Sequence, residues 1–108
     1  MSTADLAHHF PPATKWGYKD ESEVLTVEYA HGIGLQYDGY DLPIINRLWS
    51  PKHPQIFEAG NVMAIEVLEG EHRVGGVRLE TQFVVTKNGI ELIDYLPLGE
   101  ILQPKDYC

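Results

Sequence analysis

The chain has little cysteine, few basic residues and no long apolar run. Its only cysteine is the last residue, Cys108, so an internal disulfide framework and a thiolate metal cluster are both excluded. Lys and Arg number 8 against 16 Asp and Glu, which gives a formal net charge of −8 and a pI of about 4.9. Such a charge repels phosphate backbones and anionic bilayers, so we expect neither nucleic acid nor a membrane as a partner.

The apolar segments are too short for a transmembrane helix, which needs ~18 consecutive apolar residues. The N-terminus lacks the basic and then apolar pattern of a signal peptide, so a cytoplasmic location is the default expectation. A chain of 108 residues forms one domain at most, with a modest core, because about two-thirds of the unfolded surface can be buried at this size.

β-rich segments dominate the second half of the sequence. Strands are predicted near residues 62–68, 77–87 and 90–95. Asn88-Gly89 is a strong hairpin signal between the last two. A partly alternating segment at 23–29 predicts a further strand, which leads into a loop around His31 and carries this histidine to a sheet edge.

The rest of the chain is less regular. Ser2 to Asp5 can cap a short helical turn that Pro11-Pro12 ends. We interpret residues 1–21 as an N-terminal arm or remnant and 22–108 as the domain proper. Residues 36–60 hold three prolines, Pro43, Pro51 and Pro54, and are interpreted as a long ordered loop or a binding segment.

Three polar residues lie at positions where a polar side chain costs free energy on burial. Glu66 interrupts an apolar strand, Glu80 repeats this fourteen positions later, and His31 lies between glycine-rich neighbours. Side chains alternate across a sheet, so antiparallel pairing of the two strands brings Glu66 and Glu80 side by side. Like charges in that position destabilise a sheet unless a cation lies between them. The pattern therefore predicts ligands for a hard divalent cation.

The order of these motifs resembles the C-terminal half of the pita-bread metallohydrolases, the superfamily of aminopeptidase P, prolidase, methionine aminopeptidase and creatinase. The resemblance covers about residues 28 to 96 and rests on Ala30-His31-Gly32-Ile33-Gly34-Leu35, Asn61 to Glu66, Gly76 to Glu80 and Val84 to Glu91. It implies an α+β fold dominated by an antiparallel sheet, being half of a pita-bread domain. It also implies that His31, Glu66 and Glu80 are metal ligands.

The same resemblance implies hydrolysis of a short peptide or other small molecule by a water or hydroxide that bridges two metal ions, often manganese, cobalt, zinc or iron. The superfamily's two aspartate ligands come from an upstream strand that this chain starts too late to hold. We therefore expect three of the five usual ligands here, with the site completed by a missing N-terminal half or another chain. The His-Glu-x-Pro stretch of the family's peptidases is matched by Tyr40-Asp41-Leu42-Pro43, so Tyr40 replaces its histidine.

Each candidate also has a structural interpretation. His31 can hydrogen-bond the backbone of its glycine-rich turn, and Glu80 can form a surface ion pair with Arg78 on the same strand face. The candidate catalytic residues are Asp38, Tyr40 and Asp41, which surround Gly39 and are also typical turn residues.

Three functions follow. The first is a metal-dependent hydrolase of the Xaa-Pro peptidase or creatinase type, incomplete in this chain. The second is a relative of dimethylsulfoniopropionate lyase, in which Asp38 or Asp41 acts as the base. The third is a non-catalytic remnant or association module. Because the apolar face of a half-sheet needs a cover, we also expect a homodimer or a complementing N-terminal half.

Overall fold

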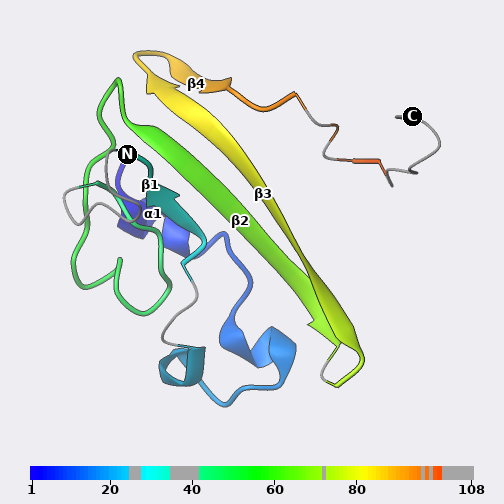
Figure 1. The fold of residues 1–108 in the computed structure, drawn as a ribbon. Helices are drawn as coiled ribbons and strands as arrows, with labels where there is room; N and C mark the ends of the chain where they lie inside the picture. Colours follow the sequence, from blue (N-terminus) through cyan, green and yellow to red (C-terminus); the bar gives the residue numbers. More distant parts are fainter. Residues whose placement is uncertain (25–27, 35–41, 72, 96, 98, 101–108) are drawn as a thin grey trace, which may run out of the picture.

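The protein is described by a computed structural model that covers residues 1–24, 28–34, 42–71, 73–95, 97 and 99–100 (Figure 1). In this part of the chain, an antiparallel sheet has the strand order β1-β2-β3-β4. Its strands are β1 (Ala30–Gly32), β2 (Val62–Glu71), β3 (Gly75–Thr86) and β4 (Gly89–Leu92). Among the described residues before β1, there are three short helices: α1 (Thr3–Ala7) and the 3₁₀ helices η1 (Ala13–Trp16) and η2 (Glu21–Val24). The predicted sheet-rich architecture with antiparallel strands and few helices is confirmed.

The long β2–β3 hairpin dominates the molecule and extends well beyond β1 (Figure 1). Its register runs from the pair Val62–Val84 to the pair Glu71–Gly75. The strands predicted at 62–68 and 77–87 are therefore confirmed, and each begins or ends a few residues from its predicted limit. Near the tip, a Cβ atom added to Gly70 would lie 2.7 Å from the Cα atom of Gly76, so the close approach of the two strands there requires glycine.

The predicted β3–β4 hairpin is also present, with Thr86 and Gly89 as the pair next to the turn. Its second strand ends at Leu92, three residues before the predicted limit of 95. No helix in the described ranges combines the length and the apolar character that crossing a bilayer requires.

The strand predicted at 23–29 is wrong, because none of its described residues lies in a strand. Glu23 and Val24 belong to η2, and the next strand begins only at Ala30; residues 25–27 lie outside the described part of the chain. Local side-chain bonds explain the difference. The Asp20 carboxylate accepts hydrogen bonds from the amide and hydroxyl of Ser22, and the Glu23 carboxylate accepts one from the amide of Lys19. Such bonds satisfy backbone donors in a turn and so compete with strand pairing.

The N-terminal segment packs against the sheet. Its α1 helix begins with a capping box between Ser2 and Asp5, which confirms the predicted short capped turn. The buried cluster contains Ala7, Tyr29, Ala30, Ile45 and Met63. The division of the chain into an arm of residues 1–21 and a domain of residues 22–108 stays a prediction.

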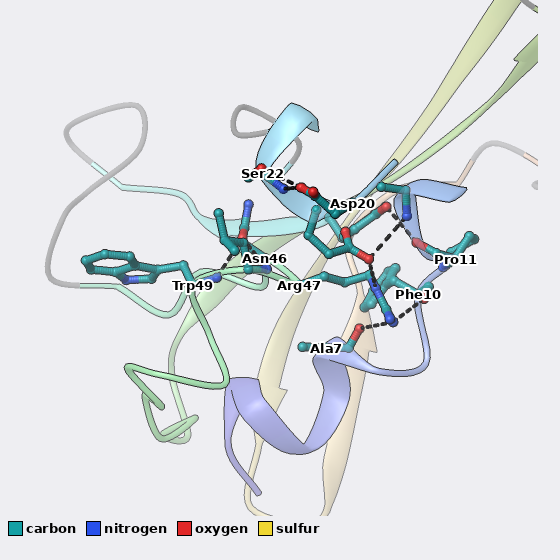
Figure 2. Close-up of polar contacts among 12 residues, drawn as sticks. Ala7, Phe10, Pro11, Asp20, Ser22, Asn46, Arg47 and Trp49 are labelled. Carbon is teal, nitrogen blue, oxygen red and sulfur yellow. Dashed lines mark hydrogen bonds and ion pairs between the residues drawn. The ribbon is translucent and has the colours of Figure 1, made fainter. Parts of the chain in front are cut away.

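Arg47 ties the same segment to the loop before β2 (Figure 2). Its Nη1 atom donates to the carbonyl oxygens of Ala7 at 3.2 Å and Phe10 at 2.7 Å, and its Nε atom lies 2.9 Å from Glu21 Oε1. One partly buried guanidinium thus holds backbone carbonyls that lie almost forty positions away in the sequence.

Candidate metal centre

His31 lies in β1, the edge strand of the sheet, and its Cα atom pairs with that of Ala64 on β2. The predicted edge position is confirmed, although the histidine belongs to the strand itself rather than to a loop. The residue is only 2% exposed. Its Nδ1 atom lies 3.2 Å from the carbonyl oxygen of Gly32 and its Nε2 atom 3.1 Å from Glu66 Oε1.

These two contacts fit a ligand histidine. A neutral imidazole that donates from Nδ1 to the Gly32 carbonyl directs the lone pair of Nε2 toward the Glu66 carboxylate. A proton or a metal cation between the two groups satisfies both. Histidines that bind metals commonly donate their other ring nitrogen to a carbonyl in this way.

Glu66 and Glu80 are direct cross-strand partners in the β2–β3 hairpin. The predicted juxtaposition of these two carboxylates is therefore confirmed. Glu66 is buried, at 6% exposure, whereas the side chain of Glu80 is 33% exposed. Two carboxylates directly opposite each other repel, and burial of one of them strengthens this repulsion, so the pair requires a compensating positive charge.

Arg78 supplies such a charge in this structure. Its Nη1 atom lies 3.1 Å from Glu66 Oε2, and its Nη2 atom lies 3.6 Å from Glu80 Oε2. The sequence suggested a surface ion pair with Arg78 as an alternative role for Glu80. This ion pair is present in the structure. The shorter contact of Arg78 with Glu66 is the part that the sequence did not reveal.

The three candidate ligands form one cluster. One donor atom from each of His31, Glu66 and Glu80 lies within 4.8 Å of the others. Two ligands at about 2.1 Å from one ion can be at most about 4.2 Å apart, so side-chain movements of roughly half an ångström are enough to bind a cation. An imidazole nitrogen with two carboxylates is a donor set for zinc, manganese, cobalt or iron. The residues present therefore fit a divalent metal.

The predicted catalytic residues Asp38, Tyr40 and Asp41 lie outside the described residues. Their roles stay predictions.

Comparison with known proteins decides the family. The model of metallopeptidase family M24 matches residues 4–87, most of the 108-residue chain. The chain belongs to metallopeptidase family M24. No curated protein and no solved structure matches it significantly.

Membership of M24 confirms the resemblance that the histidine and glutamate motifs indicated. All three members of the candidate cluster, His31, Glu66 and Glu80, fall inside the matched range. The family is one of metal-dependent peptidases, which agrees with a cluster of metal-type donors. It gives no support to the lyase interpretation or to a non-catalytic module.

Proposed function

We propose that His31, Glu66 and Glu80 bind a divalent cation and that this M24 domain takes part in the hydrolysis of a short peptide or another small amide. The observation that carries the proposal is the position of Glu66. This buried carboxylate lies 3.1 Å from an equally buried imidazole and directly opposite a second carboxylate. Arg78 offsets part of the charge of the two carboxylates, and a divalent cation shared with the imidazole would offset more of it.

The metal, when bound, supplies a water of lowered pKa and polarises a carbonyl group. The protein's own residues set the conditions for this chemistry. The Gly32 carbonyl fixes the orientation of the His31 ring through Nδ1. Pairing between β2 and β3 holds Glu66 and Glu80 next to each other, so their separation depends on the rigid hairpin rather than on a loop.

We also propose a finer assignment, namely the C-terminal half of a pita-bread fold and a hydrolase of the Xaa-Pro peptidase or creatinase type. Its support is the motif order described above, together with the M24 membership. In this proposal the site is dinuclear, with manganese, cobalt, zinc or iron, and its remaining ligands come from an N-terminal half or another chain. Asp38, Tyr40 and Asp41 are the proposed catalytic residues, and the cytoplasm is the proposed location.

A homodimer is part of the same proposal. Val67 and Leu79 are cross-strand partners and are 47% and 52% exposed, and the neighbouring Val77 is 56% exposed. These apolar side chains leave part of the hairpin uncovered in the described chain. A second copy or a complementing half would remove this area from water.

Titration with Co²⁺ tests metal binding, because cobalt bound to nitrogen and carboxylate ligands absorbs visible light. We expect a saturable band for the natural protein. Glu80→Gln should weaken Co²⁺ binding at least about tenfold, since a neutral amide replaces a charged ligand. Glu91→Gln, which changes an exposed glutamate on β4, serves as the matched control and should bind like the natural protein. Equal affinities in all three proteins would refute the ligand assignment.

The reaction is tested separately, with Mn²⁺-loaded protein and short peptides that have or lack proline after the first residue. Slow cleavage that Glu80→Gln abolishes and Glu91→Gln preserves is the expected result. Stoichiometric metal without cleavage of any peptide would leave the metal site standing and would show that this chain, alone or as a homodimer, does not complete a peptidase site.

A further inference from the structure

A groove of about 430 Å³ lies near the tip of the β2–β3 hairpin, away from the His31 imidazole. One wall comes from the η1–η2 region and contains Trp16 and Tyr18. The other wall comes from the hairpin and contains Glu69 and Glu71.

The composition of the walls points to a positively charged ligand. Glu69 and Glu71 are two residues apart on β2, so their side chains leave the strand on the same face. Trp16 and Tyr18 add the negatively polarised faces of aromatic rings. Carboxylates combined with aromatic faces are the usual means by which proteins bind ammonium and guanidinium groups.

The chain already places one of its own ammonium groups at this groove. Lys15 Nζ lies 2.6 Å from Glu69 Oε2 and 5.9 Å from the centre of the Trp16 ring. One carboxylate and one aromatic ring of the groove are thus shown to hold a cation. Glu71 is exposed and forms no ion pair within the described part of the chain, so a second carboxylate of the groove is available.

Between the two walls, glycine residues of the hairpin line the groove with backbone atoms. Gly70 and Gly76 both line the groove and pair with each other across the strands. A Cβ atom at Gly70 would overlap the backbone of Gly75 and Gly76. The missing Cβ atoms thus allow the close approach of the two strands, and the backbone of this pair forms the part of the groove between the two walls.

We propose that this groove binds the side chain of a lysine or arginine residue of a peptide, with the charged end at Glu71 and the stem against Trp16 and Tyr18. The net charge of −8 favours the approach of such peptides. Arg78 is the lining residue with a cationic side chain, and its guanidinium is already engaged by Glu66 and Glu80.

The groove and the metal centre lie on different faces of the hairpin. Side chains alternate along a strand, so Glu69 and Glu71 leave β2 on the face opposite to Glu66. The proposal therefore concerns binding by the groove itself and does not depend on the proposed hydrolysis.

Binding is measured in metal-free protein, in the presence of EDTA, so the result is independent of metal binding and hydrolysis. The sequence has two tryptophans, Trp16 and Trp49, so a Trp49→Phe background makes Trp16 the fluorescent reporter. The probes are acetyl-Ala-Lys-Ala-amide and its norleucine analogue, which keeps the stem and lacks the charge. We expect the lysine peptide to bind at least about fivefold more tightly, and to weaken at high salt.

Glu71→Gln in the same background should weaken binding of the lysine peptide about fivefold and leave the norleucine peptide unaffected. Glu91→Gln is the matched control on β4 and should change neither. Equal binding of the two peptides, an equal effect of both substitutions, or no fluorescence response to the lysine peptide would each overturn the proposal. A failure here leaves the Co²⁺ titration untouched, so the groove and the metal centre are judged separately.

Discussion

The Arg78 guanidinium lies 3.1 Å from the Glu66 carboxylate and 3.6 Å from that of Glu80, two of the three candidate metal ligands. The arginine and a divalent cation thus compete for the same negative charge. Because the Arg78 side chain is 53% exposed, it can turn into solvent when a metal binds.

Replacement of Arg78 by Gln should therefore raise metal affinity about fivefold to tenfold, while the metal-free protein loses about 1 kcal/mol of stability through repulsion between the carboxylates. Isothermal titration with Mn²⁺ measures the affinity and urea unfolding measures the stability. Lys87→Gln removes an exposed positive charge from the end of the same hairpin as a control. An Arg78→Gln protein that binds Mn²⁺ more weakly than this control would show that the arginine supports the site.

Arg47 should be the main attachment of the N-terminal segment to the rest of the molecule. Its contacts with Ala7, Phe10 and Glu21 are lost in Arg47→Met, which should cost about 2–3 kcal/mol because carbonyl oxygens and a carboxylate lose a charged donor. Limited proteolysis should then cut within the first twenty residues before the sheet is attacked. Lys52→Met, in an exposed position of the same loop, should leave both the stability and the cleavage pattern unchanged.

Tyr29 should make stability depend on pH in the alkaline range. Burial of its ring and the nearby Glu21 charge raise the pKa of Tyr29 to about 12 from its usual 10, against the opposing effect of Arg47. Because the folded-state pKa is the higher one, its contribution to stability is present below pH 10. It is lost as the pH rises from 10 to 12.

The loss amounts to about 2.7 kcal/mol at most, at about 1.36 kcal/mol for each pKa unit. Chemical denaturation at a series of pH values measures it. Tyr29→Phe removes the hydroxyl that donates to the Pro11 carbonyl at 2.9 Å, and costs about 1 kcal/mol at neutral pH. This variant should show a clearly smaller decrease between pH 10 and 12, and an unchanged decrease would refute the link.

The exposed apolar pair Val67–Leu79 should take part in self-association. Leu79→Asp places a charge at the centre of this surface and should shift a dimer toward monomer by at least about tenfold in the dissociation constant. Sedimentation velocity measures the distribution. Val74→Asp, which changes a more exposed residue at 77% in the turn, provides the comparison. If the natural protein is a monomer at high concentration, the homodimer proposal is wrong.

The sequence was sufficient to predict the pair Glu66–Glu80 because the prediction depends only on local features of the hairpin. A period of two assigns each glutamate to a face, and the short glycine-rich connection fixes the register of the hairpin. The start of the preceding strand was not predictable in the same way. There, the Asp20 and Glu23 side chains bind nearby amides and form a 3₁₀ turn within an alternating pattern.

The long-range contacts had no signal in the sequence. The bonds of Arg47 to Ala7 and Phe10 join residues forty and thirty-seven positions apart, and no local pattern reports such a distance. The contact of Arg78 with Glu66 depends on the rotamer of a long side chain as well as on strand register, so only the nearer Glu80 could be named as its partner from the sequence.

The central claim is that His31, Glu66 and Glu80 together hold a divalent cation. Metal content per chain, measured by elemental mass spectrometry after dialysis against manganese and zinc, tests it most directly. We predict about one bound ion or more per chain in the natural protein and in Glu91→Ala, and a near-complete loss in Glu80→Ala. No bound metal in the natural protein, or equal amounts in both variants, would contradict it.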